Sequence, residues 1–414
     1  MLVSGSIYLP GDKSISHRAL MLSALSDGEC IIHNISTGED VLSTRDCLLK
    51  CGIHSEVKKD KIIIKGGTLS SNGQELYCAN SGTTIRLLLG LLAGQGISAL
   101  FTGDQSLSSR PMDRIINPLS KMGVVFESNN GYLPIKMIPG KLKGIDYTLP
   151  IPSAQVKSSI LLAGLGSEGN TLVHEPIKTR DHTEIMLDYL GVDINVNASV
   201  SVSKLNFPLK CFNLSVPGDP SSAAFFAVLA AILPNSDIII KNILANPTRI
   251  GVFDVMKKMG VGMEWQNLHI ECGEFVGDLH VYSQPIHGID ITPQMVPSLI
   301  DELPIIAILA SQADSPTSVS GASELRVKES DRISTICINL SNMGCEVIEK
   351  CDGFVINPVN RLYNTNIKTF GDHRIAMAFT IAGYITEELN SLDDAKCINI
   401  SFPEFTEILH SIIK

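Results

Sequence analysis

The segment GDPSSAAFFAVLAAIL, residues 218–233, decides the fold class of this chain. Small and polar residues open it, and the residues that follow are apolar on almost every side. A surface helix has a single apolar stripe, so this helix must be buried all round. Its apolar run is well short of the roughly 20 residues that span a bilayer. We therefore expect a helix in the core of a globular domain.

The same kind of segment recurs along the chain at similar intervals. Five further copies are KSISHRALMLSAL from Lys13, NSGTTIRLLLGLLAG from Asn80, SAQVKSSILLAGL from Ser153, IDELPIIAILAS from Ile300 and GDHRIAMAFTIAGY from Gly371. A second mark is a glycine that ends a helix-like stretch and precedes a strand start, at Gly52, Gly123, Gly191, Gly260 and Gly344. β-Branched stretches such as KIIIKGG from Lys61 lie between the helices. Self-similarity of this kind indicates one mixed α/β unit used six times.

Six copies in 414 residues favour two domains of three units, with the first strand counted with the second half of the chain. Because the opening helices are apolar all round, the predicted arrangement has helices inside and sheets outside. Patterning alone leaves open the alternative of separate doubly wound α/β domains.

Composition limits the class of partner. With 44% apolar and 18% charged residues the chain is globular, and its formal net charge of -10 argues against a general binder of nucleic acid or anionic membranes. An anionic ligand must then be attracted locally. The 10 cysteines form no CxxC pair and no zinc-like cluster, and the first residues show no signal peptide. We expect reduced thiols and a cytoplasmic protein.

Helix starts that carry cations are candidate anion sites, because their N–H groups and partial positive charge attract anions. Lys13 stands at such a start, and Ser14 and Arg18, four residues apart, share one face of the helix. Ser153 and Gln155 open another such helix. Taken singly, each residue is more often an N-cap or part of a surface ion pair. Their recurrence favours a functional role.

Cationic residues also mark two turns. In NSGTTIR, Asn80, Ser81 and Gly82 form a tight turn whose glycine lets a ligand approach the backbone closely. In GDQSLSSRPMDR, the proline after Arg110 restricts that arginine to an extended conformation and aims its guanidinium from a loop. A capped helix and a solvated turn are the structural alternatives. TRDHTE adds Arg180 and a histidine that we interpret as structural.

The densest candidate site is RVKESDR, residues 326–332. Lys328 and Arg332 are expected to share one helical face, with Glu329 three residues from Arg332. A surface salt-bridge ladder is the alternative. In GDHR, Asp372 is expected to cap a helix that begins with His373 and Arg374.

Carboxylates stand near these cations in the sequence pattern. Asp301 and Glu302 lie at the mouth of an apolar helix whose Pro304 fits only the first turn. A carboxylate there and Glu329 form a candidate acid-base pair, tuned by burial and neighbouring cations. The sequence has no Walker A pattern, no dinucleotide-binding fingerprint and no metal-ligand spacing, so we expect no cofactor and no metal.

The motifs LPGDKSISHR, NSGTTIR, SSRPMDR, SAQVKSS, VKESDR and GDHR together resemble those of the 3-phosphoshikimate 1-carboxyvinyltransferase (EPSP synthase) family. They match in order and at similar intervals, from the N-terminus to about Glu407. The resemblance implies an α/β fold of two domains, each of three βαβαββ units with buried helices and sheets outside (an inside-out α/β barrel, the enolpyruvyl transferase fold). It assigns 1–12 with 218–414 to one domain and 13–217 to the other, with the active site in the inter-domain cleft.

The activity that this resemblance implies is transfer of the enolpyruvyl group of phosphoenolpyruvate to the 5-hydroxyl of 3-phosphoshikimate, in the shikimate pathway of aromatic amino acid biosynthesis. The implied catalytic residues are Asp301, Glu329 and Lys13. Those implied to bind 3-phosphoshikimate are Lys13, Ser14, Arg18, Ser153, Ala154, Gln155, Arg180, Asp301 and Lys328. Those implied to bind phosphoenolpyruvate are Lys13, Asn80, Gly82, Arg110, Gln155, Arg332 and Arg374. The resemblance also implies a monomer.

The chain departs from the family pattern at several positions. Ile400 precedes Ser401 where many relatives have lysine, Ala154 replaces a second serine, and Leu87 stands where others have proline. Gly82 leaves room for glyphosate, which mimics phosphoenolpyruvate in this family, so glyphosate is expected to bind. A helix shifted by Leu87 would weaken that binding.

Two other functions stay open on the sequence. A sister enzyme transfers the same group to UDP-N-acetylglucosamine, but it usually has a cysteine in the loop before the arginine matching Arg110, where this chain reads QSLSS. A non-catalytic anion-binding module is the second alternative. The presence of both Asp301 and Glu329 argues against it.

Overall fold

The computed structural model describes residues 1–59, 61–70 and 74–414, which divide into two compact units. The first unit comprises Met1–Pro10, Pro217–Ile270 and Glu274–Lys414, and the second comprises Gly11–Val216 with Glu271–Gly273. Gly11 and Asp12 group with the second unit and Pro217 with the first, where the sequence predicted boundaries after residues 12 and 217. Asp12 belongs there because its Oδ1 accepts a hydrogen bond from Ile15 N, 2.8 Å away, at the start of the first helix.

The second unit contains three four-stranded sheets, each with one parallel strand pair followed by two antiparallel pairs. In order across each sheet the strands are β15 (Asn213–Ser215), β3 (Glu29–His33), β5 (Lys61–Lys65) and β4 (His54–Lys58); β6 (Glu75–Tyr77), β7 (Ala99–Thr102), β9 (Tyr132–Pro139) and β8 (Val124–Asn129); and β10 (Asp146–Thr148), β11 (Thr171–His174), β13 (Val200–Val202) and β12 (Ile194–Val196). A short parallel pair joins β14 (Leu209–Lys210) to β2 (Ser26–Asp27).

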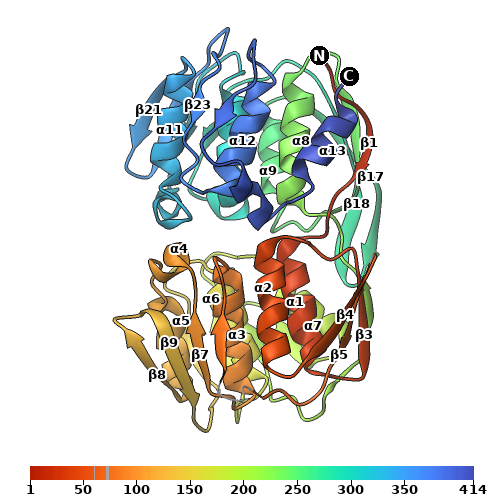
Figure 1. Ribbon diagram of the computed structural model, residues 1–414, viewed down its shortest axis with the longest axis vertical. Coiled ribbons are helices and arrows are strands. Elements are labelled where there is room, and N and C mark those ends of the chain that lie inside the picture. The colour runs from red at the N-terminus through yellow and green to blue at the C-terminus, as the bar shows by residue number, and fades with distance from the viewer. Residues whose placement is uncertain (60, 71–73) are drawn as a thin grey trace. The chain divides into compact units, whose positions relative to one another are not determined.

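Seven helices are assigned in the described part of the second unit. They are α1 (Lys13–Ala24), α2 (Glu39–Lys50), α3 (Gly82–Gly94), α4 (Gln105–Ser108), α5 (Asp113–Met122), α6 (Ala154–Gly164) and α7 (His182–Tyr189). Helix α3 packs against α1 and α6, and Figure 1 shows α3 beside α6 within this unit.

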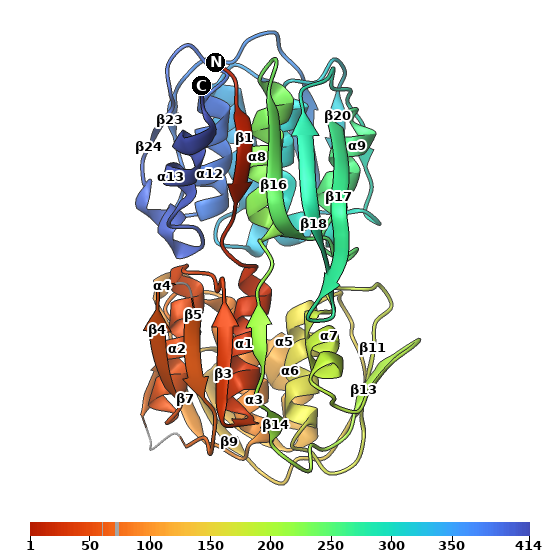
Figure 2. The same cartoon turned by 90° about the vertical axis from the view of Figure 1, so that its right-hand side faces the viewer.

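The first unit repeats the sheet pattern twice and shortens it once. Its strands are β1 (Ser4–Tyr8), β16 (Asp237–Leu244), β18 (Glu274–Tyr282) and β17 (Gly262–Glu271); β19 (Asp290–Ile291), β20 (Thr317–Val319), β22 (Gly353–Asn357) and β21 (Glu346–Lys350); and the pair β23 (Asn366–Ile367) and β24 (Ser391–Leu392). Figure 2 shows the sheet in which β1, the first strand of the chain, pairs in parallel with β16.

The helices of the first unit are α8 (Pro220–Ile232), α9 (Gly251–Lys258), α10 (Leu303–Ala310), α11 (Arg332–Asn342), α12 (His373–Gly383) and α13 (Phe405–Ile412). Four short 3₁₀ helices join them: η1 (Val296–Ser298), η2 (Ile300–Glu302), η3 (Ser323–Val327) and η4 (Lys396–Ile400). Helices α8, α10 and α12 pack against one another. Helix α13 packs through Phe405 against Phe225 and Phe226 of α8.

The helices that open the six repeats are α1, α3, α6, α8, α10 and α12, and all are largely buried. Every residue of α10 is buried, which removes the whole helix from water. Burial of each large aliphatic side chain contributes about 1.5–3 kcal/mol, so these helices form the cores around which the sheets lie. The predicted fold class, with helices inside and sheets outside, is confirmed.

Five of these helices start with a side-chain cap. The oxygens of Asp12, Ser81, Ser153, Asp219 and Asp372 each accept a backbone N–H of the first turn. The caps satisfy N–H groups that have no partner within the helix. In α10 the first turn contains Pro304, which has no N–H to satisfy, as the sequence predicts.

The glycines predicted to end a helix in each repeat are also confirmed. Gly52, Gly123, Gly191, Gly260 and Gly344 all have positive φ, from 77° to 112°. A side chain would be strained in this left-handed conformation, which ends a helix and redirects the chain into a strand.

No helix in the described ranges is long and apolar enough to cross a membrane.

Candidate active site

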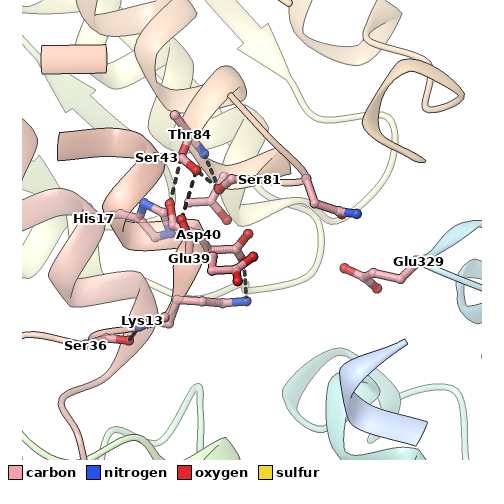
Figure 3. A network of polar contacts seen from close by, with 12 residues as sticks. Lys13, His17, Ser36, Glu39, Asp40, Ser43, Ser81, Thr84 and Glu329 are labelled. Atoms are coloured by element: carbon pink, nitrogen blue, oxygen red, sulfur yellow. Dashed lines mark hydrogen bonds and ion pairs between the residues drawn. The ribbon is translucent and has the colours of Figure 1, made fainter. Parts of the chain in front are cut away.

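The start of α1 carries Lys13, whose Nζ lies 2.9 Å from Oδ2 of Asp40 in α2. Figure 3 shows this ion pair beside the start of α3. Asp40 is buried and Lys13 is partly exposed, so the carboxylate directs the ammonium group while leaving it accessible. Ser14 and Arg18 share one face of α1 as predicted, and Arg18 Nη1 donates to the Ser14 carbonyl over 2.8 Å.

Arg18 is held by three helices of the second unit. Its Nε donates to Thr183 Oγ1 and its Nη2 to Ser158 Oγ, each over 2.7 Å. The Thr183 hydroxyl donates in turn to Ser158 over 2.7 Å, so α1, α6 and α7 meet at one buried polar contact. With 4% of Arg18 exposed, the guanidinium geometry is fixed by the fold.

The start of α3 orients Arg110. Arg110 Nη2 donates to Asn80 Oδ1 over 2.5 Å and to Ser106 Oγ over 3.0 Å. Asn80 Nδ2 donates to Asp104, 3.0 Å away, which in turn caps α4. Gly82 is the first residue of α3 and is buried. A Cβ on Gly82 would lie 2.7 Å from Arg86 Nη1 and 3.6 Å from Arg110 Nη1, so two guanidinium groups flank this backbone position.

The start of α6 contacts the start of α3 through side chains. Gln155 Oε1 accepts from Arg86 Nη1 over 2.7 Å, and Gln155 Nε2 donates to Thr83 Oγ1 over 2.9 Å. Ser153 is the N-cap of α6 and Ala154 its first residue. Gln155 therefore lies beside the starts of both α3 and α6.

Lys157, one turn into α6, is fully buried between two carboxylates. Its Nζ lies 2.7 Å from Glu175 Oε2 and 2.5 Å from Glu184 Oε1. Burial raises the pKa of Glu184 although Lys157 opposes the shift. Glu175 also accepts hydrogen bonds from the backbone N and hydroxyl of Thr179. The loop that carries the half-buried Arg180 is thereby tied to α6.

The first unit gathers its predicted residues into one cluster of charges. Asp301 Oδ1, in η2, lies 3.4 Å from both Lys328 Nζ and Arg332 Nη1. Glu329 Oε2 lies 2.6 Å from Arg332 Nη2. Both candidate acid-base carboxylates are half-buried and contact the same guanidinium.

Asp372 and Arg374 complete this cluster. Arg332 Nε donates to Asp372 Oδ2 over 2.8 Å, with both side chains almost fully buried. Asp372 also caps α12, accepting from Arg374 N over 2.9 Å. Arg374 Nη1 donates to the Asp301 carbonyl over 3.0 Å and to Glu302 over 3.2 Å. The GDHR motif therefore aligns two arginines at once.

Residues 326–332 do not form the single helix that the sequence predicted. Residues 323–327 are a 3₁₀ helix, Lys328 is extended with φ of -80° and ψ of -151°, and α11 begins only at Arg332. The Asp331 side chain caps α11 by accepting a hydrogen bond from Ser334 N, so the helix starts after Asp331. Lys328 and Arg332 therefore meet at Asp301 through a loop, and the predicted shared helical face is wrong.

The charges of the first cluster reinforce one another. Burial acts to lower the pKa of Arg332, but Asp372, Glu329 and Asp301 outweigh it and raise the pKa well above its ordinary value. The guanidinium is therefore permanently charged and fixes the positions of three carboxylates.

Sequence reasoning missed several residues of the second unit that hold these groups. Asp40, Ser158, Thr183 and Arg86 each bond a predicted residue. Ser158 and Thr183 lie in the motifs SAQVKSS and TRDHTE, so their place in a motif was the available signal. Asp40 lay in no motif that we recognised.

Two departures from the family pattern lie in packed positions. Leu87 is fully buried in α3, and Ile400 packs against the core of the first unit at the end of η4. Among the residues that the structure describes, no group of three or more His, Cys, Asp or Glu side chains is arranged to hold a metal ion.

The fold of the chain, two α/β units built from a repeated motif, is similar to that of an enolpyruvyl transferase. The enolpyruvyl transferase NikO from Streptomyces tendae superimposes with a TM-score of 0.78 over 99% of this chain and 95% of its own, at 15% identity. This likeness supports the fold alone.

Closer relatives define the family. The family model of EPSP synthase (3-phosphoshikimate 1-carboxyvinyltransferase) matches residues 2–409. The 3-phosphoshikimate 1-carboxyvinyltransferase of Alkaliphilus metalliredigens is 44% identical over 418 residues, covering 100% of this chain and 98% of its own. An EPSP synthase structure from Acinetobacter baumannii has a TM-score of 0.88 at 40% identity, covering 99% and 96% of the two chains. The chain belongs to the EPSP synthase family, and its predicted enzyme class is confirmed.

Proposed function

We propose that this protein transfers the carboxyvinyl group of phosphoenolpyruvate to the 5-hydroxyl of 3-phosphoshikimate. The observation that carries the proposal is the position of Asp301 and Glu329, two half-buried carboxylates on one buried arginine. Proton transfer to and from carbon needs such groups, and the surrounding cations suit two substrates that both carry phosphate and carboxylate.

The second unit supplies most of the anion-binding groups in this proposal. Lys13, Ser14, Arg18, Ser153, Ala154, Gln155 and Arg180 bind 3-phosphoshikimate, with Asp301 and Lys328 from the first unit. Lys13, Asn80, Gly82, Arg110 and Gln155 bind phosphoenolpyruvate, with Arg332 and Arg374. Support comes from the helix starts that present Lys13, Gly82 and Gln155, because N–H groups and cations there attract anions.

The reaction proceeds in two steps in this assignment. The 5-hydroxyl attacks C2 of phosphoenolpyruvate, its proton passes to a carboxylate, and C3 accepts a proton, which gives a tetrahedral adduct. The adduct then loses phosphate from C2 and a proton from C3, restoring the double bond in the product. Asp301 and Glu329 move these protons, while Lys13 stabilises charge that develops near its ammonium group.

We further propose that the enzyme acts in the cytoplasm as a monomer and that glyphosate competes with phosphoenolpyruvate. The turn at Gly82 supports the last point, because its buried backbone is flanked by Arg86 and Arg110 and carries no side chain to crowd a small phosphonate. Competition by millimolar glyphosate is the expected result, and its absence would remove this part of the proposal.

The test is phosphate release by the purified protein. Release that requires both 3-phosphoshikimate and phosphoenolpyruvate, with formation of 5-enolpyruvylshikimate 3-phosphate, is the expected outcome. Replacing 3-phosphoshikimate by UDP-N-acetylglucosamine gives the matched alternative acceptor, and turnover with that sugar alone would overturn the proposal. Binding of both substrates without phosphate release would instead indicate an anion-binding module.

A further inference from the structure

A buried chain of hydrogen bonds lies behind Lys13 in the second unit, and it starts at His17 (Figure 3). His17 Nδ1 lies 2.7 Å from Thr44 Oγ1 in α2, and Thr44 Oγ1 lies 2.7 Å from Thr84 Oγ1 in α3. All three side chains are fully buried. These hydrogen bonds therefore join α1, α2 and α3 inside the core.

The far end of this chain reaches two residues next to proposed substrate groups. Thr84 Oγ1 donates to Ser81 Oγ over 2.8 Å and to the Asp40 carbonyl over 3.2 Å. Ser81 is the N-cap of α3, between Asn80 and Gly82, and Asp40 is the ion-pair partner of Lys13. Both groups that the chain supports thus belong to the proposed phosphoenolpyruvate-binding side of the site.

The number of protons on each group decides which group donates in each of these hydrogen bonds. A threonine hydroxyl has one proton, and because the Asp40 carbonyl can only accept, Thr84 directs its single proton to that side, where the carbonyl and Ser81 Oγ share it. The contact between Thr44 and Thr84 must then use the proton of Thr44. Thr44 has no second proton to give, so it accepts from His17, whose Nδ1 carries the hydrogen.

The surroundings of the imidazole agree with a neutral ring. His17 is fully buried, and its Nε2 has no hydrogen-bond partner among the described residues. Burial lowers the pKa of His17 to about 3, with Lys13 and Arg18 acting in the same direction and Asp40 and Asp12 against it. A neutral ring with its hydrogen on Nδ1 leaves only a lone pair on Nε2, whereas the other tautomer buries an unsatisfied N–H donor.

We infer that His17 is a positioning residue for the reaction, whose Nδ1–H begins a one-way hydrogen-bond chain through Thr44 and Thr84 that fixes the Asn80–Gly82 turn and the Lys13–Asp40 pair. His17 acts through these groups and touches no substrate. The inference rests on the proposed function, since the turn and Lys13 matter to the reaction only if they bind phosphoenolpyruvate.

Two replacements of His17 separate positioning from simple packing. In His17→Asn the side-chain amide reaches the place of Nδ1, and in His17→Gln it reaches the place of Nε2. We expect His17→Asn to keep kcat/KM for phosphoenolpyruvate within about twofold and His17→Gln to lower it about tenfold, the effect of one lost hydrogen bond. KM for 3-phosphoshikimate should change less in both variants.

A packing role predicts the opposite order, because asparagine leaves the larger cavity. Equal activity of the two variants, or a greater loss in His17→Asn, would overturn the inference. Thr44→Val and Thr44→Ser provide a second pair in case the histidine variants fold poorly. Thr44→Ser keeps the hydroxyl and should resemble the parent protein, while Thr44→Val should resemble His17→Gln.

The tautomer provides a readout that needs no substrate. The ¹⁵N spectrum of the labelled protein should contain one imidazole with its proton on Nδ1 that is absent from His17→Asn and unchanged at neutral pH. A proton on Nε2 would contradict the inference even in an active enzyme. Absence of turnover in the parent protein would instead refute the proposed function and leave the tautomer assignment standing.

Discussion

Arg18 and Arg110 of the second unit differ from Arg332 of the first unit in the side chains that their described contacts join. In the second unit, Arg18 bonds the hydroxyls of Ser158 and Thr183, and Arg110 bonds Asn80 and Ser106. In the first unit, Arg332 bonds three carboxylates. A hydroxyl or amide fixes a guanidinium without offsetting its charge, whereas a carboxylate does both.

This difference suits the roles proposed for the two units. The hydroxyl and amide contacts orient Arg18 and Arg110, and the carboxylates held on Arg332 are in place to exchange protons. The division is not complete, because Lys13 and Lys157 in the second unit pair with carboxylates.

The largest effect is expected for Asp301→Asn in the first unit. The amide keeps the size of the side chain but cannot exchange protons, so kcat should fall by about 10² to 10⁴-fold. Steady-state phosphate release measures it, with the exposed Asp193→Asn in the second unit as control. A change of less than about tenfold in Asp301→Asn would remove the carboxylate from the proton-transfer steps.

The next largest effect is expected in the free energy of unfolding, which compares the partners of Arg332 and Arg18. Asp372→Asn leaves Arg332 with less compensation for its buried charge and should lower the free energy of unfolding by about 3–5 kcal/mol. Ser158→Ala removes one neutral partner of Arg18 and should cost about 1–2 kcal/mol. Urea denaturation of both variants gives the numbers. Equal costs would show that the two kinds of partner are energetically equivalent here.

A smaller, kinetic effect is expected at Arg110. Arg110→Lys keeps the charge but loses the guanidinium Nη2 that bonds Asn80 and Ser106, so KM for phosphoenolpyruvate should rise about tenfold with little change in kcat. The exposed Arg114→Lys in the same motif is the matched control. If both variants keep the KM of the parent protein, Arg110 does not bind this substrate.

The pH dependence of stability tests the buried histidine of the second unit. The pKa of His17 is lowered from 6.5 to about 3, so between these values the unfolded chain binds a proton that the folded chain does not. Stability is therefore lost as pH falls below about 6.5, at up to about 1.4 kcal/mol per pH unit. His17→Asn lacks this group and should show a shallower acid slope in denaturation at pH 7, 6 and 5. An unchanged slope would assign the acid sensitivity to other groups.

The smallest effect is expected for Gly82→Ala. The added methyl group meets Arg86 Nη1 at 2.7 Å, and because this is the end of a flexible side chain it can move aside. We expect the inhibition constant of glyphosate to rise about fivefold, roughly 1 kcal/mol, with a smaller rise in KM for phosphoenolpyruvate. Equal changes in both constants would show that the turn does not distinguish the two anions.

The sequence predicted best what depends on local spacing. The helix starts at Lys13, Asn80 and Gly371 were each within two residues of the observed helices, because a capping oxygen and an apolar run act over one turn. Ser14 and Arg18 share a face because they are four residues apart in a true helix. The same rule failed for Lys328 and Arg332, where Asp331 starts the helix later than the pattern indicated.

By itself, the sequence determined the repeated α/β unit, the burial of its opening helices and the residue types that gather at their starts. These properties follow from hydrophobic periodicity and from capping, which operate between near neighbours in the chain. Only the tertiary structure decided that Asp40 pairs with Lys13, that Lys157 is enclosed by Glu175 and Glu184, and that Asp301 meets Arg332. Such contacts join residues far apart in sequence, and they are set by how buried helices pack, because a charge removed from water must find its partner wherever the packing places one.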